Sequence, residues 1–451
     1  MAETDIAVIG AGETGRGLAA LAAALGLRVT LFERGAMGGE APDPEIAAAA
    51  LRAAGARAAG ARGAARMGIG TGEVPVDWLA LRTHLAAADA DAAPDSTAAR
   101  FEAMGVEVVR AAARFSAPDA VGAAGREWRF RRALIATGAA PVVPALEGLE
   151  TVPYLTADTI HELDVRPDHL LVLGGGGFGL EMAQAFARLG ARVTLLAASR
   201  IAPDSDPVLA NGLGRALRRD GVNLMEGHEA VRAERREGGV ALLLADGTRL
   251  EGSHLLLALG RAPRLAGLDL VAAGLTGSVP EVDGTLRVAG NRRIWAAGGC
   301  IGRPGGTDLG TLARSMLFRL PGTPGTPPAV RAIRTEPALV EIGALGGGET
   351  LRWPLADTTR AAAEGIEEGL VTLSVDRRGG LAGAGLLAPG GLEMAGMLAL
   401  SVGRPVSELA AAALPQPSLS AAIARAALEH RAPAFGSPAV RWLAGIAKRL
   451  P

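Results

Sequence analysis

Residues 5–33 read DIAVIGAGETGRGLAALAAALGLRVTLFE, and this stretch decides the fold. The apolar run at 6–9 predicts a buried strand, the Ala- and Leu-rich segment after it predicts a helix, and residues 28–32 predict a second strand. Three glycines stand between the first strand and the helix in the spacing G-x-G-x-x-G: Gly10, Gly12 and Gly15. The flanking strands and helix argue against a chance match in a chain this rich in Gly and Ala.

Each part of this strand-turn-helix-strand unit has a physical task. Gly10 allows the tight turn, Gly12 lets the backbone approach a pyrophosphate, and Gly15 lets helix and strand pack closely. The helix N-terminus faces the phosphates. Glu33, at the end of the second strand, can accept hydrogen bonds from both hydroxyls of a ribose. The unit therefore predicts a dinucleotide-binding site.

The composition describes an ordinary globular protein. The chain has 451 residues, 49% of them hydrophobic and 21% charged, with a formal net charge of -1. This length favours about three domains, and the near-neutral charge argues against nucleic acid or anionic lipid as a partner. A single cysteine, Cys300, excludes an intramolecular disulfide. No segment resembles a signal peptide or a membrane span, so we expect a cytoplasmic protein.

A second copy of the unit occupies residues 169–200, HLLVLGGGGFGLEMAQAFARLGARVTLLAASR. Its glycines have the same spacing: Gly174, Gly176 and Gly179. Two units predict two dinucleotides, one a donor and the other an acceptor. Ala197 and Ala198 stand where an acid would end the second strand, and Arg200 could instead accept a 2′-phosphate, which favours NADPH over NADH. The alternative that Arg200 is a solvated loop residue stays open.

The rest of the chain completes a three-part organisation. A strand at 255–260 closes the domain of the second unit, and the segment 260–263 returns the chain to the first. Beyond a Pro/Gly linker, three strand-like runs and two helices predict an α+β domain with an antiparallel sheet. The expected fold is α/β, with two Rossmann-like domains and a C-terminal α+β domain. The predicted limits are 1–145 and 263–325 for the first domain, 146–262 for the second and 326–451 for the third.

These features together resemble the pyridine nucleotide-disulfide oxidoreductases, the flavoenzymes that include dihydrolipoamide dehydrogenase, glutathione reductase and mercuric reductase. The resemblance rests on both glycine units, on Ala136-Thr137-Gly138, on Gly260-Arg261-Ala262-Pro263 and on the C-terminal domain. Segments at 95–108, 154–156 and 357–370 are most similar to the mercuric reductase-like branch. The resemblance implies FAD on the first unit, with Thr137 and Gly138 beside it, NAD(P)H on the second, and a homodimer through the C-terminal domain.

The sequence departs from this family at the reactive positions. After Gly38-Gly39 the family carries two cysteines and then Pro-Ser-Lys, whereas residues 40–46 read EAPDPEI in a shorter loop without cysteine or lysine. No dithiol can accept electrons there. In the C-terminal domain Gln416 and Ala421 replace the His and Glu that serve as acid and base in the family. The two losses agree, because without a thiol that base has nothing to protonate.

Three further positions bear on the cofactors. In the Gly298-Gly299 turn, Gly299 replaces the aspartate that hydrogen-bonds the ribityl chain of the flavin in the family, so the protein could lack a flavin altogether. Glu181 matches the family glutamate beside flavin and nicotinamide, whose Lys partner is absent here. It is the one catalytic candidate, and the alternative is an ordinary acid in the first turn of a helix. Cys300, next to the flavin-side turn, is either packing or chemistry. No histidine spacing suggests a metal.

The predicted function is therefore that of a FAD-dependent NAD(P)H oxidoreductase without the disulfide half-reaction. Hydride would pass from nicotinamide to flavin and then to an external small-molecule acceptor such as a quinone, a dye or dioxygen. The alternative is a non-catalytic dimeric relative that acts as a nucleotide-binding or scaffold protein. Genuine disulfide or mercuric ion reduction would need a cysteine from a partner. The sequence leaves the electron acceptor and the pathway open.

Overall fold

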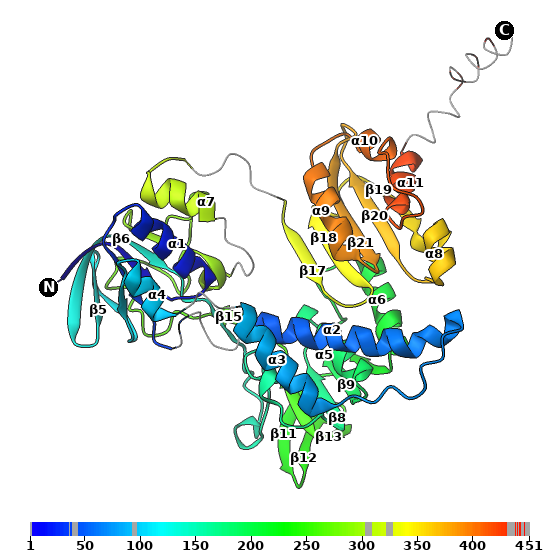
Figure 1. Cartoon of the computed structure of the whole chain (residues 1–451), viewed down its shortest axis with the longest axis horizontal. Coiled ribbons are helices and arrows are strands. Elements are labelled where there is room, and N and C mark those ends of the chain that lie inside the picture. The colour runs from blue at the N-terminus through cyan, green and yellow to red at the C-terminus, as the bar shows by residue number, and fades with distance from the viewer. Residues whose placement is uncertain are drawn as a thin grey trace.

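The chain folds into three lobes, each built on its own sheet (Figure 1). The computed structural model describes residues 2–35, 37, 44–92, 97–302, 309–321 and 328–430, together with positions 438, 440, 442 and 446. Gly38-Gly39, residues 40–43 of the shortened loop predicted at 40–46, and Asp95-Ser96 lie outside the described residues.

The first lobe is organised by its longest strand, β6. Its sheet has the order β3-β2-β1-β6-β5-β4, with β16 paired to the far end of β6. The strands are β1 (Ala2–Ile9), β2 (Val29–Phe32), β3 (Glu107–Val109), β4 (Arg114–Ala117), β5 (Ala120–Ala123), β6 (Arg126–Ile135) and β16 (Ile294–Ala296). Strands β1, β2, β3 and β16 run parallel to β6 or to its parallel neighbours, so their carboxyl ends meet at one edge. Helices α1 (Glu13–Ala24), α4 (Ala98–Ala103) and α7 (Leu309–Leu312) cover one face.

The second lobe repeats this plan around a four-stranded parallel sheet in the order β10-β9-β8-β14. Its strands are β8 (His169–Leu173), β9 (Arg192–Ala197), β10 (Val222–Glu226) and β14 (His254–Leu257), with an antiparallel meander of β11 (Ala230–Arg236), β12 (Gly239–Leu244) and β13 (Arg249–Gly252). Helices α5 (Gly177–Arg188) and α6 (Pro207–Arg219) follow β8 and β9. The short strands β7 (Ala139–Pro141) and β15 (Arg261–Pro263) pair where the chain crosses between the first two lobes.

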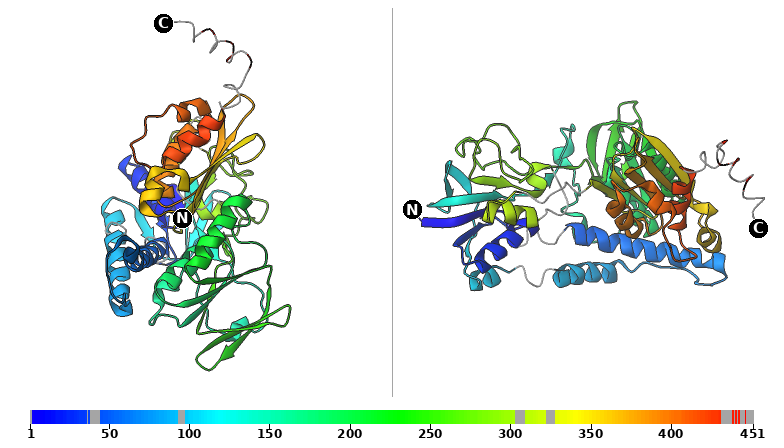
Figure 2. Two further views of the ribbon diagram at one scale, coloured as in Figure 1. Left: turned by 90° about the vertical axis from the view of Figure 1, so that its right-hand side faces the viewer. Right: turned by 90° about the horizontal axis from the view of Figure 1, so that it is seen from above.

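Two helices from the early part of the chain pack on the second lobe. They are α2 (Pro44–Gly63) and α3 (Trp78–Ala92), which run along one side of the molecule in Figure 2. A Cβ on Gly55 of α2 would lie 3.1 Å from the carbonyl oxygen of Ala185 in α5, so this glycine permits the close approach of the two helices. Trp78 of α3 packs against Phe186 with ring centroids 6.0 Å apart.

The third lobe is an antiparallel sheet in the order β17-β18-β21-β20-β19. Its strands are β17 (Val330–Ile333), β18 (Ala338–Gly343), β19 (Glu349–Pro354), β20 (Leu370–Val375) and β21 (Leu381–Ala388), and its helices are α8 (Thr359–Glu364), α9 (Gly391–Ser401), α10 (Val406–Ala410) and α11 (Ala421–Glu429). One face of the sheet buries an apolar core against α9, α10 and α11. The other face lies on α6, where a Cβ on Gly212 would come within 2.5 Å of the Leu387 side chain.

This architecture confirms the predicted α/β fold with two Rossmann-like lobes and an α+β C-terminal lobe. The domain limits stay predictions. The meander β11–β13 and the edge strands β17 and β19 were not predicted, because their short mixed segments carry no clear apolar alternation. Within the described residues, no helix is both long enough and apolar enough to cross a bilayer.

Candidate nucleotide-binding site

A cavity opens at the edge of the first lobe where the parallel strands end. Its volume is about 320 Å³, within the range of small-molecule pockets. It lies among the glycine turn after β1, the end of β2, the turn after β6 and the strand β15 that returns from the second lobe. The lining residues used below are Gly10, Gly12, Glu33, Ala111, Ala112, Ala113, Thr137, Gly138, Asp158, Arg261 and Arg264.

The glycines of the first unit have the geometry that a phosphate-binding turn requires. Gly10 has a φ of 105°, and a Cβ there would lie 2.4 Å from the carbonyl oxygen of Ala136. A Cβ on Gly15 would lie 2.0 Å from the carbonyl oxygen of Gly10. Gly12 instead faces open space, with no atom within 4 Å of an added Cβ. Gly10 and Gly15 therefore serve the turn itself, and Gly12 leaves room for a ligand at the N-terminus of α1.

Glu33 is held at the mouth of this turn by backbone groups. One carboxylate oxygen accepts a hydrogen bond from the Ala11 N–H at 2.7 Å, and the other accepts one from the Gly35 N–H at 2.8 Å. A carboxylate has about four lone-pair positions, so these two bonds leave capacity for ribose hydroxyls. The predicted ribose contact is thus pre-oriented in the cavity.

A charged cluster that the sequence analysis did not single out closes the other side of the cavity. Asp158 lies between two arginines, 2.5 Å from Arg261 and 3.5 Å from Arg264. Arg261 also donates to the carbonyl oxygen of Ala139 at 2.6 Å. Both guanidinium groups line the cavity, where they could bind an anionic ligand. The buried hydroxyl of Thr137 has no hydrogen-bond partner among the described residues, so a ligand oxygen could satisfy it.

The turn on the riboflavin side is built differently. Gly298 has a φ of 81°, and a Cβ on Gly299 would lie 3.0 Å from the backbone nitrogen of Ala139 and 3.1 Å from the carbonyl carbon of Gly138. The two turns therefore touch, and a side chain at Gly299 would need the neighbouring turn to move by a few tenths of an ångström. The residues present fit the ADP half of FAD, whereas the ribityl anchor is missing.

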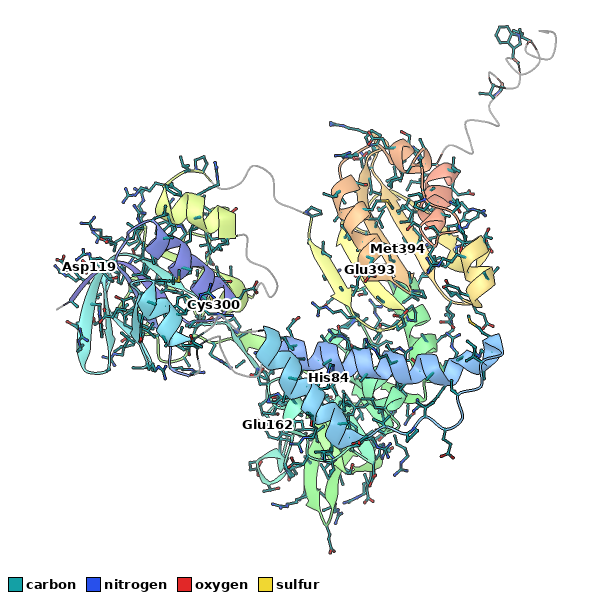
Figure 3. All side chains as sticks on the ribbon, in the orientation of Figure 1. His84, Asp119, Glu162, Cys300, Glu393 and Met394 are labelled. Carbon is teal, nitrogen blue, oxygen red and sulfur yellow. The ribbon has the colours of Figure 1, made fainter. Side chains whose placement is uncertain are left out.

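Cys300 is a packing residue in this structure. Its side chain is fully buried in the first lobe, where Figure 3 labels it. The thiol lies 3.3 Å from the carbonyl oxygen of Ile135 and 3.2 Å from that of Ala297, and it donates to this pair of acceptors. Burial raises the pKa of Cys300 to about 11, so the thiol stays protonated and unreactive near neutral pH.

The second unit has the same glycine geometry as the first, but its second strand does not end in an acidic residue. Gly174 has a φ of 128°, a Cβ on Gly179 would lie 2.3 Å from the Gly174 carbonyl oxygen, and Gly176 faces open space. Arg200 donates to the carbonyl oxygens of Pro203 at 2.5 Å and Ser205 at 2.6 Å. Its guanidinium is thus tied to its own loop, and its role toward a 2′-phosphate stays a prediction.

Glu181 has a partner that the sequence analysis missed. The family lysine is absent, as the sequence indicates, and Arg52 of α2 instead donates to the Glu181 carboxylate at 2.6 Å. The other carboxylate oxygen accepts from the Arg334 N–H at 2.8 Å. Burial raises the pKa of Glu181 and lowers that of Arg52. Arg52 is the one charged residue between Glu45 and Arg57 in an Ala-rich helix, but this pattern does not indicate which residue Arg52 contacts.

Helix α5 also forms hydrogen bonds to the start of the third lobe, at Glu336. Gln184 donates to the carbonyl oxygen of Glu336 and accepts from its N–H, both at 2.8 Å. Arg188 donates to the same carbonyl oxygen at 3.0 Å and forms an ion pair with Asp220 at 3.0 Å. Glu181, Gln184 and Arg188 therefore join three segments that are distant in the sequence. Glu181 does not line the cavity of the first lobe, and its catalytic role stays a prediction.

Residues 4–316 match the family described as Pyridine nucleotide-disulphide oxidoreductase. The chain belongs to this family. Its members use FAD and NAD(P)H and are typically homodimers.

Individual relatives are similar over much of the chain. A mercuric reductase of Streptomyces lividans is 39% identical over 302 residues, which cover 61% of this chain and 63% of the relative. A NAD(P)H dehydrogenase (quinone) of Mycobacterium tuberculosis is 30% identical over 315 residues, covering 65% and 64%. The chain thus spans less than two thirds of the length of these two relatives. The solved structure of LpdA from Mycobacterium tuberculosis is 27% identical with a TM-score of 0.82, covering 94% of this chain and 99% of LpdA.

Proposed function

We propose that the protein is a FAD-dependent NAD(P)H oxidoreductase that lacks the disulfide half-reaction and passes electrons to an external acceptor such as a quinone, a dye or dioxygen. One observation carries this proposal. Both glycine turns keep the geometry of nucleotide sites, while the single cysteine of the chain is buried with its thiol bonded to backbone carbonyls.

The residues of the chain supply binding and alignment. Bound FAD would provide the ring that accepts a hydride from NAD(P)H. Glu33 and the Gly12 turn would hold the ADP half of FAD, and the Gly176 turn would hold the nicotinamide dinucleotide. Arg52 and Glu181 lie where α2 meets α5, so this ion pair fixes the spacing of the two elements. Alignment of two reactants is itself a large source of rate enhancement and needs no acid or base.

Glu181 acts in this scheme as a positioning residue for the nicotinamide. Its carboxylate bonds to Arg52 and to the Arg334 N–H, and only 4% of the residue is exposed. A carboxylate with both oxygens engaged holds its orientation well. The proposal for Glu181 rests on this geometry and on its match to the family glutamate.

The acceptor is external because the chain offers no internal one. Disulfide relatives need a pair of thiols, and Cys300 is alone. Gln416 and Ala421 likewise provide no acid and base for thiol chemistry. The Mycobacterium tuberculosis relative named NAD(P)H dehydrogenase (quinone) supports a quinone as the acceptor class. The relatives named mercuric reductase instead support mercuric ion as the acceptor, so an experiment must decide between the two acceptors.

The test is a comparison of acceptors with the FAD-reconstituted protein. We expect oxidation of NADPH or NADH with a soluble quinone or dye, and no turnover with glutathione disulfide, lipoamide or mercuric ion. Turnover of a disulfide or of mercuric ion at a rate comparable with the quinone would contradict the proposal. Oxidation by dioxygen alone is measured as the background for each acceptor.

A second candidate function is a non-catalytic nucleotide-binding relative. Gly299 and Ala197 favour it, because they alter the two cofactor sites and not only the thiol site. Protein that binds FAD and NADPH yet shows no activity with any dye would support this candidate.

The proposal includes a homodimer through the third lobe. Helix α9, on which Figure 3 labels Glu393 and Met394, exposes Leu392 by 41% and Leu400 by 78%. Burial of such side chains in a dimer would remove apolar surface from water. Light scattering during gel filtration should give the mass of two chains, and Leu400→Arg should shift it toward one. A wild-type chain that stays monomeric at micromolar concentration would argue against this assembly.

A further inference from the structure

Helix α6 of the second lobe lies against the sheet of the third lobe (Figure 1). The loop at 198–206 leads from strand β9 into this helix. We propose that Glu341 of the third lobe is a positioning residue for this loop, and that it thereby sets the affinity of the second glycine unit for NAD(P)H. The inference rests on the proposed function in one respect, namely that NAD(P)H is the nucleotide of the second unit.

Glu341 is a buried acid on the face of the sheet that packs against α6. It lies opposite Gly385, where an added Cβ would come within 2.6 Å of the Leu209 side chain of α6, and only 4% of Glu341 is exposed. One carboxylate oxygen accepts a hydrogen bond from the Asp206 N–H at 2.7 Å, and the other forms an ion pair with Arg331 at 3.3 Å. Because the acceptor is a carboxylate, the bond from Asp206 is stronger than one between neutral groups.

Asp206 joins this contact to the start of α6. One oxygen of its side chain caps the helix by accepting from the Val208 and Leu209 N–H groups at 2.8 and 3.2 Å. The other oxygen accepts from Arg352 of β19 at 3.2 Å. The last residue of the loop is therefore held by two strands of the third lobe, through its backbone by Glu341 and through its side chain by Arg352.

The middle of the loop packs on the second glycine turn. The Ala202 N–H donates to the carbonyl oxygen of Gly175 at 2.8 Å. A Cβ on Gly175 would lie 2.7 Å from the Ala197 side chain and 3.3 Å from the Cα of Ile201, so the turn and the loop are in direct contact. Ala202 has a φ of 43°, in the left-handed region that alanine rarely adopts. Such a conformation persists only where the surroundings impose it, so a shift at Asp206 should reach the turn.

The opposite end of α6 offers a matched contact with the third lobe. There Glu368 forms ion pairs with Arg219 at 3.0 Å and with Arg215 at 3.5 Å. Its side chain is 19% exposed, so this contact is also largely buried. Glu341 ties the third lobe to the loop, whereas Glu368 ties it to the last turn of the helix. The two acids therefore distinguish an effect on the nucleotide from a general loosening of the two lobes.

The test compares Glu341→Met with Glu368→Met, each of which replaces a carboxylate by an apolar side chain of similar length. We expect Glu341→Met to raise the dissociation constants for NADPH and NADH roughly fivefold or more, because the loop no longer holds the turn in place. Glu368→Met should leave both constants within about twofold of wild type. Fluorescence titration with each nucleotide measures them on protein whose FAD has been reduced beforehand, so that the nucleotide is not oxidised.

Glu341→Gln is the rescue variant. Its side-chain carbonyl can still accept from the Asp206 N–H, so both constants should stay within about twofold of wild type. In turnover with a dye, Glu341→Met should raise KM for the nucleotide and leave kcat unchanged, which is the effect of lost binding alone. A merely structural role for Glu341 would lower the stability of both Met variants without this difference between KM and kcat.

The outcomes are distinct. Unchanged affinity in Glu341→Met would overturn the proposal, and so would an equal loss of affinity in Glu368→Met. Should Glu341→Met fail to fold, Glu341→Asp withdraws the carboxylate from Asp206 by one methylene group and keeps its charge. It should raise both dissociation constants, and no change would again overturn the proposal. Failure of the oxidoreductase proposal would appear as absent turnover, which leaves the titrations unaffected.

Discussion

The two glycine units of this chain have nearly the same turn geometry, but they differ in the residue at the end of their second strand. A Cβ on Gly10 would lie 2.4 Å from the carbonyl oxygen of Ala136, which follows strand β6. A Cβ on Gly174 would lie 2.3 Å from that of Ala258, which follows strand β14. After the second strand of each unit, Glu33 in the first corresponds to the buried Ala197 in the second. The geometry of the turn is thus the same in both units, while the residue at the end of the second strand differs.

This contrast indicates which residues can vary without a change of fold. The turn glycines touch backbone atoms, so their replacement must disturb strand, turn and helix together. Glu33 and Ala197 lie at strand ends, where side chains face the ligand edge of the sheet. Changes there should alter binding, although a larger side chain at the buried Ala197 must also displace its core neighbours.

The largest effect is expected from Gly10→Ala and Gly174→Ala. The added methyl group meets a carbonyl oxygen at a φ that alanine rarely adopts, and strain and overpacking together cost roughly 2–6 kcal/mol. Chemical denaturation measures the loss of stability in each lobe. Gly12→Ala and Gly176→Ala are the matched controls, because both positions have ordinary φ values of -67° and -78° and open surroundings. Equal destabilisation by the controls would refute the division of roles among the glycines.

The next largest effect is expected from removal of the ion pair that joins α2 to α5. Arg52→Met leaves the Glu181 carboxylate buried without its cation, which costs roughly 3 kcal/mol when the acid cannot protonate. The double variant Arg52→Met with Glu181→Gln should recover most of that loss. Urea denaturation of the single and double variants gives the coupling energy. A coupling near zero would mean that α2 and α5 are held together by apolar packing alone.

The nucleotide preference should follow the strand-end residue. Ala197→Glu copies the first unit into the second, and the added carboxylate should favour NADH over NADPH by roughly tenfold through its ribose bond. Dissociation constants for both nucleotides measure this effect. Arg200→Ala should weaken NADPH alone if the guanidinium leaves Pro203 and Ser205 for the 2′-phosphate. An equal change for both nucleotides would leave Arg200 as a loop residue.

A smaller effect concerns pH. Burial raises the pKa of Glu181 above its ordinary value of 4.5 in the folded protein. The folded state therefore holds this proton more tightly than the unfolded state, and stability is lost as pH rises from 4.5 through the raised pKa. Glu181→Gln has no proton to lose, so its stability relative to wild type should improve over that window. A difference that stays constant with pH would mean that Arg52 fully compensates the buried charge.

The smallest effect is expected at Cys300. Its pKa of about 11 and complete burial predict no reaction with a thiol reagent in the native protein near neutral pH and one equivalent after unfolding. Cys300→Ala should leave quinone reduction unchanged. Rapid native labelling, or a large loss of quinone reduction in the variant, would reassign Cys300 to chemistry.

The glycine turns and the strands of both units could be predicted because the periodic apolar pattern and the positive-φ glycines lie close together in the sequence. The Arg52–Glu181 pair could not, since it joins residues on two helices whose contact exists only in the folded chain. The same holds for Asp158 with Arg261 and Arg264. The sequence predicts that Gly299 has no side chain to bond the ribityl chain of a flavin. Its contact with Gly138 and Ala139 is visible only in the folded structure.

We propose a reductive half-reaction that ends at the flavin, because the chain has a single cysteine and so no dithiol to accept the electrons next. The direct measurement is an anaerobic titration of the FAD-loaded protein with NADPH, read as absorbance near roughly 450 nm, the visible band of oxidised flavin. We predict complete loss of this absorbance with one equivalent of NADPH for each FAD. No loss would contradict hydride transfer, and consumption of two equivalents would contradict the absence of a second electron acceptor in the chain.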